Sequence, residues 1–274
     1  MSNSLIKANT LMALGEYNSA IKYFKAYMDE EPHIPLSKEV LQVLSKAYNK
    51  LSNDNRYYIR ELEAYLESLQ GGNQERIEAI TSLLDETRND LIAICTEVVN
   101  IIDNNLIKNM NETRERVLIY NMKGVYYRYM WEINKSDAIC KKATKAYQEA
   151  MSICQWNFEP TDPYLLQVAL NFTTHLNNAN NTEQAISILR IVIQNTHTED
   201  LQNYDFLKKS YVELILKYLN ETLIRFQNIF NKKLIRIIEL IEESENNNRL
   251  PLQEDDIFVM NVITLDNAIT RRLG

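Results

Sequence analysis

Glycine and proline are so scarce in this chain that tight turns can interrupt it at only a few places. Five residues of each type occur among 274, although these residues supply many of the backbone angles that turns need. Leucine, isoleucine, alanine, glutamate and lysine are common and valine is sparse, which favours helices over sheets. The length allows one sizeable hydrophobic core or two modest ones. We therefore expect an all-α fold of long helices with short connections.

Breaks in the helical periodicity of the apolar residues predict about nine antiparallel helices. Gly15 ends the short first helix, and Pro32 closes a second that begins at about Asn18. Ser37 is a candidate cap for a long third helix, which Gly71 and the next glycine stop. The remaining helices are expected near residues 75–107, 112–134, 136–156, 163–178, 182–197 and 205–230.

The pattern changes after residue 230, which divides the chain into a helical domain at residues 1–230 and an extension at residues 231–274. Residues 231–248 predict a further amphipathic helix or a continuation of the ninth one. Pro251 breaks this helix, and residues 257–272 are compatible with one more, weaker helix. The extension is therefore expected to be partly helical.

The sequence lacks the patterns of an enzyme, a metal site or a cofactor site. Cys95, Cys140 and Cys154 lie among apolar neighbours without paired spacing, which predicts buried, reduced thiols. There is no nucleotide-binding loop and no paired nucleophile and base. The net charge of −7 argues against nucleic acid as a partner recognised by overall charge. We expect a binding protein without catalytic residues or a cofactor.

Hydropathy gives no reason to expect a membrane partner. The N-terminal residues lack an apolar stretch long enough for a signal peptide, and no window is apolar enough for a membrane span. We therefore expect the protein in the cytoplasm, with the nucleus as a second option.

Five separated segments resemble, in order, the pattern of the 14-3-3 family over residues 1 to about 226. Any one of them is weak, but the ordered set at comparable intervals is specific. The segments are LSKAYNK (44–50), NMKGVYYRYMWE (121–132), AYQEAMSI (146–153), PTDPYLLQVALNF (160–172) and LNETL (219–223). The resemblance implies nine antiparallel helices around a concave groove. It also implies an adaptor that binds phosphoserine or phosphothreonine peptides of client proteins in signalling.

In this family two arginines, a lysine and a tyrosine hold the phosphate, and the resemblance assigns Arg56, Arg128 and Tyr129 to that site, with Arg60 in support. Guanidinium suits the role because its planar fork donates two parallel hydrogen bonds and keeps its charge. Spacing alone favours a plainer interpretation, in which acids one turn away neutralise the arginines on a solvated face. Glu63 would then pair with Arg60, and a glutamate at 132 with Arg128.

Asn49 stands where the family has the phosphate-binding lysine. Lys50 follows as a substitute, but it points about 100° away around the helix. Losing a charge-assisted hydrogen bond costs roughly 1.5–3 kcal/mol. We therefore expect the phosphate clamp, formed by Arg56, Arg128 and Tyr129, to bind more weakly than a clamp with the lysine.

The resemblance also implies a groove for the rest of the peptide. Asn171 and Asn220 match residues that hold the peptide backbone, a role for which an amide has both a donor and an acceptor. The groove wall would consist of Lys123, Leu170, Val212, Leu216 and Leu223.

An interaction scaffold that ignores phosphorylation is the alternative function. Residues 13–32 resemble a tetratricopeptide-like helical hairpin, but no second copy follows at a period of about 34 residues. Phosphorylated client proteins remain the expected partners. The chain's own acidic or phosphorylated tail is a further candidate, although a solvated or packed extension is the favoured interpretation of that segment.

The homodimer that is usual in the family is in doubt for this chain. The resemblance implies that Glu16 would face Asp90 across such a dimer, and that Ser19 would face Glu86. The first pair is two like charges where the family has an acid–base pair, and like charges across an interface are unfavourable. We expect a monomer or an altered dimer.

Overall fold

The computed structural model describes residues 2–31, 38–69, 72–107, 112–196, 201–202 and 204–247, and every structural statement below concerns these residues. They form nine α-helices and one short π-helix, without a strand, which confirms the all-α prediction. The elements are α1 (Asn3–Ala13), α2 (Tyr17–Glu30), α3 (Lys38–Ser68), α4 (Gln74–Ile101), η1 (Ile102–Leu106), α5 (Thr113–Asn134), α6 (Asp137–Asn157), α7 (Pro163–Asn178), α8 (Thr182–Asn195) and α9 (Phe206–Asn247).

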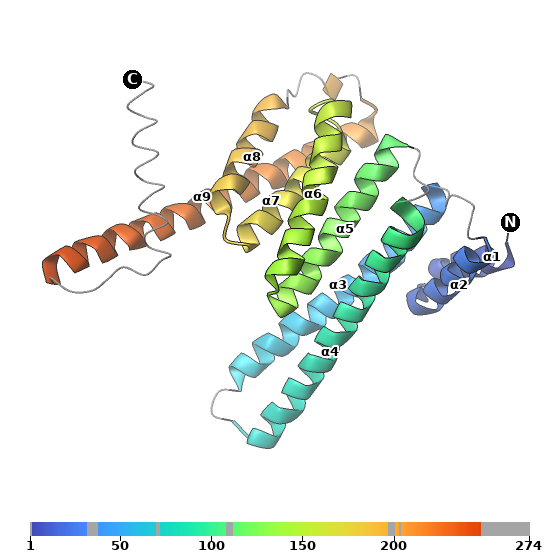
Figure 1. Cartoon of the computed structure of the whole chain (residues 1–274), viewed down its shortest axis with the longest axis horizontal. Helices are drawn as coiled ribbons and strands as arrows, with labels where there is room; N and C mark the ends of the chain where they lie inside the picture. The colour runs from blue at the N-terminus through green and yellow to red at the C-terminus, as the bar shows by residue number, and fades with distance from the viewer. Residues whose placement is uncertain are drawn as a thin grey trace.

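Helices that follow one another in the sequence pack side by side (Figure 1). The order runs from the α1–α2 hairpin through the long pair α3 and α4 to α5, α6, α7 and α8, and α9 contacts both α7 and α8. Short connections between helices enforce this neighbour-to-neighbour packing. Helix α5 consequently lies in the middle of the array, where it contacts α4, α6 and α7.

Two hydrophobic clusters stabilise the array, and α5 contributes to both. Phe24, Tyr48 and Leu91 belong to the first cluster, which lies between α1 and α6. Leu189 and Phe226 belong to the second, which extends from α5 to α9. Apolar burial contributes roughly 25 cal/mol for each Å², so a helix that is buried in both clusters is held firmly. Side chains on α5 therefore have well-defined positions.

Helices α5 and α6 approach each other closely at Gly124 of α5. A Cβ atom placed there would lie 2.7 Å from the ring of Tyr147 on α6, a distance at which neighbouring atoms must move. Glycine at this position lets the Tyr147 ring lie directly on the α5 backbone, next to the residues of the candidate site.

Helix ends follow local signals where they are described. Gly15 has a φ of 79° after α1, a left-handed conformation that glycine adopts easily. The side chains of Asn73 and Asp162 accept hydrogen bonds from backbone N–H groups at the starts of α4 and α7. The proposed cap at Ser37 lies outside the described residues.

Two expectations about the elements changed, and one open alternative was decided. The fourth helix does not continue regularly to residue 107, because the π-helix η1 takes over at Ile102. The ninth helix continues without a break to Asn247, so the extension begins as part of α9. The thiols of Cys95 and Cys154 are buried as expected, whereas Cys140 is only partly buried. Pro251 and residues 257–272 lie outside the described residues.

No described helix combines the length and the apolar character that a membrane crossing requires.

Candidate functional site

Helices α3 and α5 bring Arg56, Arg128 and Tyr129 together, although Arg56 is far from the other two in the sequence. The Tyr129 ring contacts both guanidinium groups. The Cζ atom of Arg56 lies 4.0 Å from the ring centroid, and that of Arg128 lies 5.0 Å from it. Cation–π contact of this kind favours a fixed position for each cation. The structure thus gathers the residues that sequence reasoning proposed for the phosphate.

One carboxylate, that of Glu132, joins the two arginines. Nη2 of Arg56 lies 3.1 Å from its Oε2 atom, and Nη1 of Arg128 lies 3.0 Å from its Oε1 atom. Asn178 of α7 also donates to Oε1, at 3.1 Å. The acid one turn from Arg128 was expected from spacing, but its bond to Arg56 on another helix was not. Two positive charges therefore share one negative charge, which leaves a net positive charge at the site.

Arg128 is held from behind by Tyr147. Its Nε atom donates to the Tyr147 hydroxyl at 3.3 Å, and burial raises the pKa of Tyr147 to about 12. Burial alone would lower the pKa of Arg128, but the tyrosine and Glu132 outweigh that effect and raise it. Arg128 is only 7% exposed and stays charged. It is a buried cation with a fixed orientation.

His175 of α7 lies next to Tyr147, and these two residues form a buried layer behind the clamp. The His175 ring is fully buried and packs at 5.5 Å from the Tyr147 ring and 5.8 Å from the Trp131 ring. Its Nε2 atom lies 2.9 Å from Thr144 Oγ1, whereas Nδ1 has no hydrogen-bond partner among the residues that the structure describes. Burial, together with the charge of Arg128, lowers the pKa of His175 to about 4. The ring is therefore neutral at physiological pH.

Sequence reasoning did not assign Tyr147 or His175 to the site. Tyr147 was noted only as part of a matching segment, and nothing local marked it as a partner of Arg128. His175 occupies the apolar face of α7 between Phe172 and Leu176, and a histidine on such a face was the available signal.

Asn49 and Lys50 of α3 each bond to residues other than the two arginines. Asn49 accepts a hydrogen bond from the Tyr126 hydroxyl at 3.1 Å and donates one to Ser45 Oγ at 3.3 Å. Lys50 Nζ lies 2.5 Å from Asp54 Oδ1, one turn along the same helix. The structure therefore does not bring the lysine to the two arginines.

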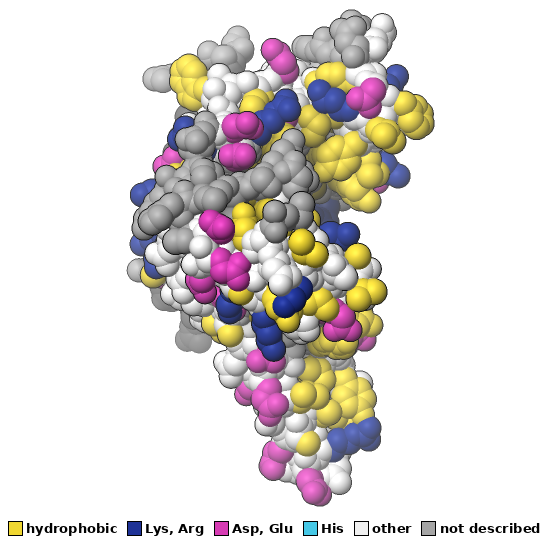
Figure 2. All heavy atoms as spheres, turned by 90° about the vertical axis from the view of Figure 1, so that its right-hand side faces the viewer, with side chains coloured by type: hydrophobic (Ala, Val, Ile, Leu, Met, Phe, Trp, Pro, Cys, Tyr) yellow, Lys and Arg dark blue, Asp and Glu magenta, His cyan; other side chains and the backbone are white. Residues whose placement is uncertain are grey.

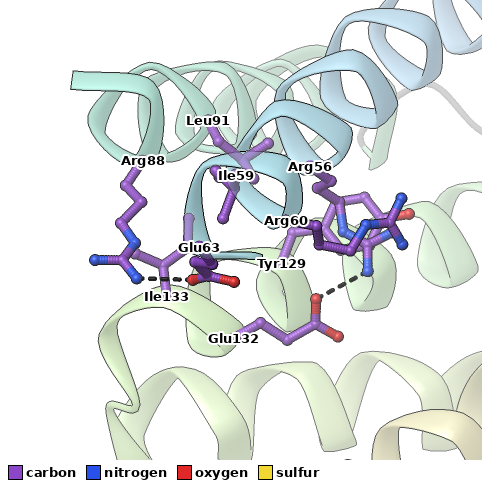
Figure 3. Close-up of a pocket in the computed structure, with 9 residues that line it drawn as sticks. All are labelled: Arg56, Ile59, Arg60, Glu63, Arg88, Leu91, Tyr129, Glu132 and Ile133. Atoms are coloured by element: carbon purple, nitrogen blue, oxygen red, sulfur yellow. Dashed lines mark hydrogen bonds and ion pairs between the residues drawn. The ribbon is translucent and has the colours of Figure 1, made fainter. Parts of the chain in front are cut away.

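A pocket of about 200 Å³ lies beside the clamp, between α3, α4 and α5. Arg56, Arg60 and Glu132 line one side of it, and Arg88 and Glu63 line the other (Figure 3). Glu63 pairs with Arg88, at 2.8 Å, and no ion pair joins it to Arg60. The apolar part of the lining comes from Ile59, Leu91 and Ile133.

The proposed groove residues have less defined surroundings than the clamp. The Asn171 amide donates to Asn121 Oδ1 at 3.1 Å. The Asn220 amide donates to the Leu216 carbonyl of its own helix at 2.8 Å. Lys123 Nζ lies 2.5 Å from Asp103 Oδ1 of η1, so its charge is partly neutralised.

The apolar wall residues differ in exposure. Leu170, Leu216 and Leu223 are partly buried against the second hydrophobic cluster, whereas Val212 is fully buried within it. Val212 therefore lies behind the wall and not on it. Hydrophobic side chains gather along one edge of the view in Figure 2, where the outline of the molecule is indented.

The positions proposed for a dimer contact lie on α4 and around the start of α2. Glu16, Glu86 and Asp90 are exposed, and Ser19 is partly buried. No ion pair within the described part of the chain neutralises Glu16 or Asp90. The proposed tail ligand, at residues 250–274, lies outside the described residues.

Comparison with protein families gives a match over most of the chain. The model described as "14-3-3 protein" matches residues 7–227. All the clamp and groove residues discussed above lie inside the matched segment. Helix α9 continues beyond it to Asn247.

Proposed function

The chain belongs to the 14-3-3 family, and we propose that it is an adaptor that binds phosphoserine or phosphothreonine segments of client proteins. The cluster of Arg56, Arg128 and Tyr129 carries this proposal. A phosphorylated side chain brings a charge of about −1.5 to −2 and three acceptor oxygens. Two guanidinium groups and a phenol are suitable donors for such a group.

A phosphate ligand has to compete with Glu132 for the N–H groups of the two arginines. The Glu132 carboxylate already accepts from both arginines, so a phosphate has to take over some of their N–H groups. A phosphate dianion carries more charge than one carboxylate, and each guanidinium has five N–H donors. In our proposal the phosphate binds both arginines and weakens the bond between Arg56 and Glu132.

The rest of the phosphopeptide would lie in an extended conformation in the groove. Asn171 and Asn220 each keep an amide group that is able to pair with a peptide backbone. Leu170, Leu216 and Leu223 would contact its side chains. Residues 1–230 form the binding domain in this proposal, and residues 231–274 are an extension of it. We assign no catalytic role to the chain and place it in the cytoplasm or the nucleus.

The decisive experiment compares a fluorescent phosphoserine peptide with its unphosphorylated twin by fluorescence anisotropy. The phosphorylated peptide should bind at least about tenfold more tightly, which corresponds to 1.4 kcal/mol. Arg56→Ala should abolish this preference. Arg190→Ala, at an exposed arginine of α8, should leave it unchanged. Equal binding of both peptides to the unaltered protein would leave only the phosphorylation-independent scaffold.

We also propose that the dimer usual in the family is weakened in this chain. Glu16 and Asp90 are both exposed acids, and their apposition would be repulsive. Sedimentation at micromolar concentration should show a monomer or a loose dimer. A tight dimer of the usual geometry would contradict this proposal.

A further inference from the structure

Arg60 lies one helical turn from Arg56, at the edge of the proposed phosphate site. It is exposed and extends from α3 in the same direction as Arg56 (Figure 3). Arg56 is paired with Glu132, and Arg88 is paired with Glu63 and Asp85. No acidic partner for Arg60 exists among the residues that the structure describes. Its charge is available to a ligand.

The pocket beside Arg60 has the size and lining for one side chain. Its volume is about 200 Å³, and Ile59, Leu91 and Ile133 contribute apolar surface to its lining. The other charged residues around the pocket largely neutralise one another. A group that complements it therefore has a short hydrocarbon part and one negative charge, as a glutamate side chain does.

The spacing of the two arginines defines where this group would sit on a peptide. Residues one helical turn apart are about 5–6 Å apart on the surface of a helix. An extended peptide advances about 3.3 Å per residue, and every second side chain lies on the same side. A side chain two positions from the phosphorylated residue thus reaches Arg60 when the phosphate lies on Arg56.

We propose that the pocket at Arg60 is a second anion subsite, which selects phosphopeptides with a glutamate two residues from the phosphorylated residue. This inference rests on the proposed function, because the phosphate must first place the peptide. The subsite adds a preference that the clamp alone does not produce. A glutamate two residues from the phosphorylated residue strengthens binding, although it lies close to Glu132 of the protein.

The test measures affinities of the full chain for a set of phosphoserine peptides by fluorescence anisotropy. The peptides carry Glu, Gln or Leu two residues before or two residues after the phosphoserine. Glu should bind about threefold to fivefold more tightly than Gln at one of the two positions, as expected for a partly exposed ion pair. Raising the salt concentration to about 0.5 M should shrink this ratio, because exposed charges are screened.

Arg60→Gln should reduce the Glu-to-Gln ratio to about one, and Arg190→Gln on α8 should leave it unchanged. Comparing the two peptides on each protein isolates the pairwise contribution, so a general loss of affinity does not affect the result. A ratio that survives Arg60→Gln would overturn the subsite. A gain with Leu but not with Glu would also overturn it.

The outcomes separate the two proposals. If the protein prefers phosphoserine over serine but shows no Glu effect at either position, only the subsite is wrong. If the phosphorylated and unphosphorylated peptides bind equally, the proposed function is wrong and the subsite with it.

Discussion

The two ends of the proposed binding surface are built differently. At the clamp, Arg128 is buried, bonded to Tyr147 and Glu132, and in contact with the Tyr129 ring. At the far end, Asn220 is exposed, and its amide donates a hydrogen bond to a backbone carbonyl of its own helix. The clamp is therefore fixed before a ligand arrives, whereas the groove residue is not. A preorganised site spends less free energy on ordering when it binds.

This difference predicts that the clamp residues contribute to both the stability of the fold and the binding of phosphopeptides, whereas the groove residues contribute only to binding. Substitutions at the clamp should change both the free energy of unfolding and the affinity for phosphopeptides. Substitutions in the groove should change the affinity alone. The following predictions test this contrast, beginning with the largest expected effect.

Arg128→Ala should be the most damaging substitution. It leaves the buried Tyr147 hydroxyl without its partner and removes one of the two arginines that pair with Glu132, which keeps its bonds to Arg56 and Asn178. We expect a loss of about 3 kcal/mol, at the low end of the cost of breaking a buried ion pair. Urea denaturation measures this loss, and circular dichroism shows whether the variant still folds. Arg128→Lys keeps the charge and separates the two effects, because it should fold but lose most of the phosphopeptide affinity. A stable Arg128→Ala variant would contradict the idea of a fixed clamp.

Acid should weaken the layer behind the clamp through His175. The folded protein lowers the pKa of this residue to about 4, from about 6.5 in the unfolded chain. The folded state therefore binds fewer protons, and stability falls as the pH drops from about 6.5 towards 4, by up to about 3 kcal/mol. His175→Gln should remove this part of the pH dependence. The check is the free energy of unfolding of both proteins at pH 7.5 and 4.5.

Asn49→Lys tests whether the clamp is incomplete. A lysine at this position would add a charge-assisted hydrogen bond to the phosphate, worth roughly 1.5–3 kcal/mol. Phosphopeptide affinity should rise by at least about tenfold, while affinity for the unphosphorylated twin stays low. Lys50→Gln is the control, since Lys50 is paired with Asp54 and its removal should have little effect. Unchanged affinity of Asn49→Lys would show that the clamp is complete without a lysine.

Glu132→Gln should make the clamp a stronger anion site at the expense of stability. The neutral amide no longer competes with the phosphate for Arg56 and Arg128, so phosphopeptide affinity should rise by about tenfold. The two arginines then repel each other without a carboxylate between them, so the protein should lose about 1–2 kcal/mol of stability. Binding titrations and urea denaturation together give both numbers. A loss of affinity would mean that Glu132 orients the arginines and does not compete with the ligand.

The residues proposed for the clamp could be named from the sequence, whereas the contacts around them could not. Composition and periodicity were enough for the all-α fold, and ordered segments pointed to Arg56 and Arg128. The bond from Glu132 to Arg56 joins residues 76 positions apart, and helical spacing carries no information about such a contact. The support of Arg128 by Tyr147 depends on the close approach of α5 and α6 at Gly124. These contacts come from tertiary packing, which local patterns do not report.

The smallest effect on stability is expected at the groove end, from Asn220→Ala. Its side chain is exposed and bonds to the Leu216 carbonyl one turn back, and alanine is the better helix former. Stability should change by no more than about 0.5 kcal/mol. If Asn220 holds the peptide backbone, phosphopeptide affinity should fall by about threefold to tenfold. Asn228→Ala, at an exposed asparagine of the same helix, should change neither quantity. If Asn220→Ala lowered the stability but not the affinity, Asn220 would have a structural role, and the proposed difference between clamp and groove would be wrong.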